Sequence, residues 1–333
     1  MPDAGALLHP GSKPGWLGGG IPPAMSEIIL RPIADQDRAE LAALICVSTN
    51  FWYQTHGRPP IFPGGPASTE VFAEVYEALD PGCCVAAVDR RTGQLTGSCF
   101  YHPRPTHVSL GIMNVHPNHA GAGVASTLLR FILDFADRAG KPVRLVSSAV
   151  NLDSFSLYTR AGFVPRCAYQ DMWLAVPPDG LGAMPPAASR VRDAVPDDVG
   201  PMAALELEVA GIRRDQDYRY FIENRAGFWH TAVCPGADGG LAGWIVSSAH
   251  PGSNMIGPCV ARDQEVALAL LLRELDRHRG RRPVWLVPVE CTQMTGPLYR
   301  LGARNCELHF SQVRGAWTPF RGVSMPTFLP ETA

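Results

Sequence analysis

The segment with the most specific chemistry is the run VHPNHAGAGVAS, which spans residues 115–126. We expect a strand to end at Val115 and a loop containing Gly121 and Gly123 to lead into the first turn of a helix. Backbone amides that converge at a helix N-terminus, with the positive end of the helix dipole behind them, form an anion site suited to a pyrophosphate. Glycine is needed in such a loop because a side chain would keep the phosphates away.

Two other phosphate-binding motifs are excluded by spacing. The chain has no GK[ST] of a P-loop. The strand before the glycines belongs to an antiparallel hairpin rather than to a βαβ unit, which argues against a dinucleotide-binding fingerprint. A purely structural turn is one remaining interpretation of the two glycines. A phosphate-bearing ligand without a nucleotide-binding fold is the other, and coenzyme A fits that description.

A second patterned segment, NLDSFSLYTRAGF, follows about thirty residues later. With the glycine loop and the strand between them, it resembles the GCN5-related N-acetyltransferase (GNAT) family. That family's loop is usually written R/Q-x-x-G-x-G/A and its later element N-x-x-A-x-x-LY-x-x-x-GF. In the loop, Gly123 and Ala125 match, while Ala120 stands where Arg or Gln is usual. The later element has Ser154 in place of alanine and matches at Asn151, Leu157, Tyr158, Gly162 and Phe163.

The resemblance covers about residues 27–176 and implies acetyl-CoA, or another acyl-CoA, bound in a V between two splayed strands, with no metal. It also implies direct attack of a substrate amine on the thioester, with Tyr158 as the general acid for the leaving thiolate. A phenol with a pKa of about 10 can protonate a thiolate whose conjugate acid lies at roughly 8.5–10. A tyrosine ring packed in the core is the alternative. Without an arginine at Ala120, we expect weaker binding of coenzyme A, because only the loop amides and the helix end remain.

The resemblance also indicates which residues contact the cofactor. They lie at the end of the strand, in the loop and first helical turn, and in the later element: Met113, Asn114, Val115, Ala120, Gly121, Ala122, Gly123, Val124, Ala125, Ser126, Asn151, Ser154 and Tyr158. Asn151 has an alternative role as the N-cap of the helix that follows it.

A general base is harder to identify, because the strand HVSLGIMNVHP contains no acidic residue. His107 is the candidate, with His102 and His116 as alternatives, since an imidazole titrates near neutral pH. A structural histidine is the competing interpretation. Strand alternation places His107 and Met113 on one face and Asn114 on the other.

The acceptor pocket is expected in the segment NFWYQTHGRPPIF, a loop that covers the acceptor site in this family. Its aromatic wall would consist of Phe51, Trp52, Tyr53, His56 and Phe62, joined by Tyr76 from the second helix. A hydrophobic plug under a long loop is the alternative. Glu70 and Glu74 either attract an ammonium group or belong to a solvated helix face.

The surrounding elements predict an α/β (α+β) fold. Their order is strand, two helices, three antiparallel strands, helix, strand, helix and strand, which makes a mixed, mostly antiparallel sheet with helices on both faces. The chain then repeats at a shift of 161 residues, so that Arg31 matches Arg192 and Asp37 matches Asp198.

The sequence therefore predicts two tandem GNAT-like domains. Residues 1–25 are expected to be a disordered tail, with Met25 as a second candidate start; residues 26–176 the catalytic domain; 177–189 a linker; and 190–333 a degenerate copy. That copy lacks the glycine loop, and Asp263 and Glu265 at its helix start would repel a pyrophosphate. It keeps Tyr299 and Gly302 of the later element. Its final segment, GVSMPTFLPETA, is expected to be an extended strap over the partner domain.

Composition limits the class of protein. The 333 residues include 29 Lys+Arg and 31 Asp+Glu, a net charge of −2 that argues against a nucleic-acid partner. No run reaches the ~18 apolar residues of a membrane span. The nine cysteines form no CxxC pairs, which favours reduced thiols in a cytoplasmic protein.

The predicted function is N-acetyl transfer from acetyl-CoA to a small-molecule amine, such as an amino acid, polyamine, aminosugar or antibiotic. A homodimer formed through the second domain is a further expectation. A non-catalytic acyl-CoA-binding regulator or scaffold is the alternative from another class. A CoA-linked decarboxylase and an O-acyltransferase stay open as well.

Overall fold

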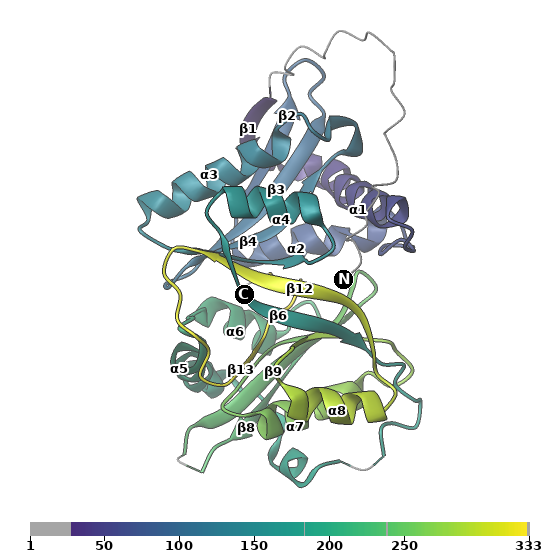
Figure 1. Cartoon of the computed structure of the whole chain (residues 1–333), viewed down its shortest axis with the longest axis vertical. Helices are drawn as coiled ribbons and strands as arrows, with labels where there is room; N and C mark the ends of the chain where they lie inside the picture. Colours follow the sequence, from purple (N-terminus) through teal and green to yellow (C-terminus); the bar gives the residue numbers. More distant parts are fainter. Residues whose placement is uncertain (1–27, 183, 238, 332–333) are drawn as a thin grey trace, which may run out of the picture.

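A computed structural model of the chain describes residues 28–331 with the exception of 183 and 238. The predicted tail over residues 1–25 lies outside these described residues. Within them, the chain forms two similar halves stacked along the long axis of the molecule (Figure 1).

The first half follows the predicted order of elements. Its strands are β1 (Ile28–Pro32), β2 (Cys84–Asp89), β3 (Leu95–Pro103), β4 (Val108–Val115), β5 (Val143–Ser148) and β6 (Val164–Trp173), and its helices are α1 (Arg38–Thr55), α2 (Glu70–Leu79), α3 (Val124–Arg138) and α4 (Leu152–Arg160). Helix α1 is longer than expected and includes Phe51, Trp52 and Tyr53, which the sequence analysis placed in a loop. It ends only where Gly57 takes a left-handed conformation at φ 71°.

The second half repeats this order. Its strands are β7 (Arg192–Asp193), β8 (Trp229–Pro235), β9 (Leu241–His250), β10 (Ser253–Ala261), β11 (Val284–Pro288), β12 (Arg304–Arg314) and β13 (Val323–Met325), and its helices are α5 (Val199–Ala210), α6 (Asp215–Glu223), α7 (Gln264–Arg277) and α8 (Thr292–Arg300). The repeat extends to individual ion pairs. Arg31 forks onto Asp37 at 2.5 and 2.9 Å, and Arg192 forks onto Asp198 at 2.7 Å through both nitrogens.

The last strands of the two halves are exchanged. Strand β12 lies between β5 and β6 and pairs antiparallel with both, while β6 also pairs with β11 of the second half. The described strands thereby form one 13-stranded sheet in the order β1-β2-β3-β4-β5-β12-β6-β11-β10-β9-β8-β7, with β13 paired to β10. Each half therefore completes the sheet of the other.

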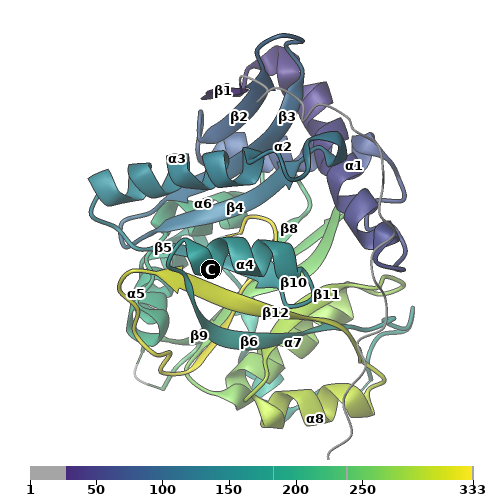
Figure 2. The ribbon, with the colours of Figure 1, turned by 45° about the horizontal axis from the view of Figure 1, so that its top comes forward.

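The helices form three groups around this sheet. Helices α3 and α4 pack on one face of the first half, and α7 and α8 cover the second half (Figure 2). Helices α1, α2, α5 and α6 share a single apolar core that spans both halves. Near that core, Arg104 of the first half is fully buried and pairs with Asp80 at 2.7 Å and with Asp217 of α6 at 2.6 Å. The halves are thus joined by apolar packing, by a charge network and by exchanged strands.

The described residues also show three general features. None of their helices is long and apolar enough to cross a membrane. All nine cysteines are free thiols. No group of three or more histidine, cysteine or acidic side chains among these residues could hold a metal ion.

Candidate cofactor and acceptor site

Strands β4 and β5 separate to form the predicted V. They pair in parallel only at Val108 with Val143 and at Ser109 with Arg144. Beyond these residues the strands diverge toward their C-terminal ends. The facing edges of the two strands are therefore not hydrogen-bonded to each other beyond Ser109 and Arg144.

A β-bulge in β4 changes which side chains face the V. Cys99 and Tyr101 are two residues apart on β3, but their partners Met113 and Leu110 are three apart on β4. Because a bulge inserts one residue, it reverses the alternation after it. Met113 accordingly packs with the α3 side of the sheet, and the Asn114 amide donates to Ser48 of α1 at 2.7 Å on the other side. The prediction that Met113 shares a face with His107 is wrong for this reason.

The glycine loop leads directly from the end of β4 into α3. Gly121 and Gly123 have φ of 78° and 81°, a region that residues with a side chain avoid. Gly123 is the N-cap of α3, and no described side chain caps this helix. The first amides of a helix have no partner inside it. The start of α3 is therefore free to bind an anion beside the open V.

The second half differs at both corresponding places. The carboxylate of Asp263 is the N-cap of α7 and accepts the amide of Val266 at 2.8 Å, so an acidic group already occupies this helix start. Strands β10 and β11 pair only at Met255 with Val284, but β13 lies along the open edge of β10. A strand of the chain itself thus fills the V of the second half.

Tyr158 lies on α4 and is 7% exposed, with its ring 5.7 Å from that of Phe163. Burial raises the pKa of its hydroxyl, and the nearby Cys99 and Glu331 raise it further. The phenol therefore keeps its proton at neutral pH, and the raised pKa makes it a weaker proton donor than an exposed tyrosine. Asn151 caps the same helix, because its side-chain oxygen accepts the amide of Ser154 at 3.0 Å.

The three histidines considered as bases occupy different places. His107 lies at the closed end of the V, fully buried, with its ring nitrogens 3.0 Å from Thr106 Oγ1 and 3.0 Å from Ser109 Oγ. Burial and the nearby Arg144 lower its pKa well below the usual range. The structure therefore does not bring His107 to the opening. His116 instead accepts the amide of Asn118 in the loop after β4 at 3.2 Å.

His102 is equally buried but differs in having, within the described part of the chain, one ring nitrogen without a hydrogen-bond partner. Its Nδ1 is 2.6 Å from Asp80 Oδ2, while its buried Nε2 has no hydrogen-bond partner among the described residues. A Cβ built on Gly111, at the bulge of β4, would lie 3.0 Å from that Nε2. The imidazole is therefore oriented by a carboxylate and presents its free nitrogen to the bulge.

The predicted aromatic wall is divided by the structure. Tyr53 and Tyr76 point inward, whereas Phe51 is 50% exposed and Trp52 stacks on His56 at 4.2 Å on the outer end of α1. Phe62, the sixth residue of the predicted wall, is buried in the core, with its ring centroid 5.7 Å from that of Phe72. Only part of this set therefore faces the interior. Phe62 fits the alternative interpretation, a hydrophobic plug under a long loop.

Sequence reasoning missed the polar side chains of β12. Glu307 accepts hydrogen bonds from Tyr53 at 2.9 Å, from Arg58 at 3.2 Å and from Ser148 at the end of β5. Two residues along β12, His309 Nδ1 is 2.9 Å from Asp171 of β6. No local pattern could have indicated these groups, because the strand exchange alone brings them under the V of the first half.

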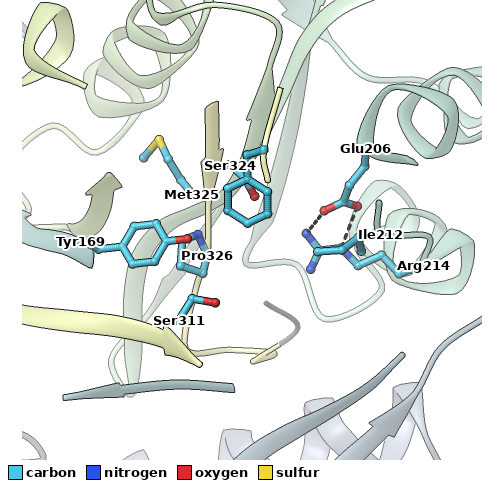
Figure 3. A pocket seen from close by; sticks show the side chains of 9 residues that line it. Tyr169, Glu206, Ile212, Arg214, Ser311, Ser324, Met325 and Pro326 are labelled. Atoms are coloured by element: carbon cyan, nitrogen blue, oxygen red, sulfur yellow. Dashed lines mark hydrogen bonds and ion pairs between the residues drawn. The ribbon is translucent and has the colours of Figure 1, made fainter. Parts of the chain in front are cut away.

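A small cavity lies between the halves (Figure 3). It is lined by Tyr169, Glu206, Ile212, Arg214, Ser311, Phe320, Ser324, Met325 and Pro326. Arg214 and Glu206 form a buried ion pair at 2.6 Å on one side of it. Residues from β6, β12 and the C-terminal segment form the opposite side.

Comparison with known proteins adds independent evidence. Residues 49–163 match the family model described as the acetyltransferase (GNAT) family. No curated protein matches the sequence.

Several solved structures have a similar fold along almost their whole length. A protein from Pyrococcus horikoshii named as an acetyltransferase has a TM-score of 0.67 at 15% identity, covering 91% of this chain and 92% of that chain. A GCN5-related N-acetyltransferase from Sphaerobacter thermophilus has a TM-score of 0.58 at 20% identity, covering 88% and 97%. A tandem GNAT protein from the clavulanic acid biosynthesis pathway has 0.56 at 17%, covering 88% and 100%. At these identities the structures establish the fold.

Proposed function

We propose that the first half is an acyl-CoA-dependent N-acyltransferase, because residues 49–163 match the model of the acetyltransferase (GNAT) family and the described residues have the fold of two tandem GNAT-like domains. The most direct form of the reaction transfers acetyl from acetyl-CoA to the amine of a small molecule. One observation carries this proposal: the start of α3, which no described side chain caps, follows directly on β4 where β4 and β5 are no longer paired.

The residues at the V fit the proposed cofactor. Free amides at the start of α3 and the loop at Gly121 and Gly123 would hold the pyrophosphate. The open edges of β4 and β5 offer backbone groups to the pantetheine arm, as a strand would. When bound, acyl-CoA would supply the thioester that the amine attacks. Ala120 contributes no charge, so binding would depend on backbone groups.

Tyr158 and His102 would divide the proton transfers. The attacking amine must lose a proton, and His102, oriented by Asp80, has a free Nε2 to accept it. The leaving sulfur must gain a proton, which Tyr158 would donate from its neutral hydroxyl. This assignment replaces His107, whose two ring nitrogens are already engaged.

The acceptor would enter from the α1 side, beneath the V. Tyr53 and Glu307 lie there, and the carboxylate of Glu307, which already pairs with Arg58, would accept a further hydrogen bond from an ammonium group. We therefore keep a small-molecule amine as the substrate class. The same proposal includes a linker over residues 177–189 between the two domains. It also includes a cytoplasmic location and a homodimer formed through the second half.

An amine-panel screen with detection of free thiol tests the proposal most directly. Release of coenzyme A that depends on one class of amine supports catalysis and identifies the acceptor. Stabilisation by acetyl-CoA without turnover of any amine would instead favour a non-catalytic acyl-CoA-binding protein. Failure of acetyl-CoA at millimolar concentration to raise the melting temperature would rule out both.

A further inference from the structure

The C-terminal segment runs from the V of the second half toward that of the first. After β13, the backbone of Pro326 passes so close to β10 that a Cβ on Gly257 would lie 2.8 Å from its oxygen. Thr327 is buried, and the ring of Phe328 lies 4.7 Å from that of His309 on β12. Phe328 also packs in the cluster that contains Val146 of β5. The segment has then crossed from one half to the other.

The last described residues reach the opening between β4 and β5. The hydroxyl of Tyr76, on the α2 side of the sheet, donates to the carbonyl of Phe328 at 3.2 Å. It also meets the backbones of Glu331 and of Ile112 on β4. Leu329 is 1% exposed and belongs to the core shared by α1, α2, α5 and α6.

The C-terminal segment also contributes to the electrostatic environment of Tyr158. Burial is the main reason that the pKa of Tyr158 is raised, but the Glu331 carboxylate adds to it. The direct contacts of the segment lie on the α2 side, where Phe328 meets Tyr76 and packs with Val146 of β5.

We propose that residues 327–331 form an intrasteric strap, which fills the thioester end of the V in the first half and withdraws before acyl-CoA binds. This inference rests on the proposed function of that V. The strap and the acyl-bearing end of the cofactor require the same volume, because Phe328 packs in the cluster with Val146 of β5 and accepts a hydrogen bond from Tyr76, whose hydroxyl also meets the backbone of Ile112 on β4. Within the described residues, the strap is held by apolar packing of Phe328 and Leu329 and by the hydrogen bond from Tyr76.

The test measures the affinity of acetyl-CoA in full-length chains by titration calorimetry. Leu329→Asp puts a charge where an apolar side chain is buried, which should expel the strap. If the withdrawn state is at most about 10% populated in the parent, the variant should bind acetyl-CoA at least about tenfold more tightly. Leu207→Asp is the matched control, because Leu207 is 45% exposed on α5, and its affinity should equal that of the parent.

A chain that ends at Pro326 provides the second variant. It keeps β13, and circular dichroism melts show whether it is folded. Tight binding by both strap variants supports the strap. Equal affinity for the parent, the control and the two strap variants overturns it and leaves the proposed function standing. If no form binds acetyl-CoA, the proposed function fails and the strap fails with it. Weaker binding after truncation would show that the segment completes the site, and would also overturn the proposal.

Discussion

Tyr158, the proposed general acid, is buried in the core of the first half. Its ring packs in the apolar cluster on the α3 side of the sheet, and burial raises the pKa of its hydroxyl. In each turnover, a neutral phenol would donate its proton only when the thiolate leaves. Loss of the Tyr158 hydroxyl should therefore lower kcat without changing the affinity for acetyl-CoA.

Tyr158→Phe should lower kcat by about 100-fold or more, the range for loss of a general acid, while the Kd for acetyl-CoA stays within about twofold. Steady-state kinetics with an amine found in the panel and calorimetry measure the two effects. Tyr101→Phe is the matched control, since Tyr101 is buried on the same side of the sheet, with its ring 5.0 Å from Phe135, and has no proposed role. Equal loss of kcat in both variants would contradict the acid assignment.

The base assignment depends on a comparison of two histidines. His102→Gln should reduce kcat by about 100-fold for an amine that is protonated in solution, because the free Nε2 beside Gly111 is removed. His107→Gln should leave kcat within about threefold, because both ring nitrogens of His107 are already hydrogen-bonded. The same kinetic assay measures both, and a larger effect at His107 would restore the original candidate.

At the scale of elements, the turn before the first helix of each half is built in the same way. Asp37 accepts the amide of Ala34 and Asp198 that of Val195, each at 2.8 Å, while an arginine forks onto the same carboxylate. The hydrogen bond from Arg31 lowers the pKa of Asp37. Burial opposes the shift at Asp198, but Arg192 and the Val195 amide still lower its pKa.

Asp37→Asn and Asp198→Asn should each reduce the free energy of unfolding by about 1–2 kcal/mol at pH 7. A carboxylate whose folded pKa is lowered stabilises above its unfolded pKa and loses this contribution as the pH falls through the folded value. The difference from the parent should therefore shrink as the pH falls below about 4. Urea melts at pH 7 and pH 3.5 measure it, and a difference that does not depend on pH would contradict this account.

The bulge in β4 and the length of α1 are element-scale features that local patterns missed. Alternation in HVSLGIMNV gives no sign of an extra residue, since the bulge is defined by its partners Cys99 and Tyr101 on β3. Helix α1 continues through Phe51, Trp52 and Tyr53 and ends at Thr55, two residues before the left-handed Gly57. Both features move predicted site residues: Met113 changes face, and Tyr53 becomes part of a rigid helix.

At the scale of the whole molecule, the halves depend on each other. Strand β12 covers the edges of both β5 and β6, and Arg104 is buried against Asp217 of the other half. An uncovered strand edge promotes aggregation, and a buried guanidinium that loses a partner is costly.

A fragment that contains only residues 26–189 should therefore be aggregated or unfolded when expressed alone. Co-expression with residues 190–333 should restore a soluble one-to-one complex. Size-exclusion chromatography with light scattering measures both results. A monomeric, cooperatively melting fragment would show that the first half does not need the exchanged strand.

The sequence by itself determined the elements that depend on near neighbours: the glycine loop before α3, Tyr158 on its helix, and the repeat marked by Arg31 and Asp37. These follow from backbone conformation, periodicity and short spacing, which are local properties of a chain. Only the tertiary structure decided that Glu307 lies under the V of the other half, that His102 rather than His107 faces the bulge, and that β13 and the strap lie in the two openings. Each of these contacts joins residues far apart in sequence, and pairing over such distances is fixed by the shared packing of both halves, which no local pattern encodes.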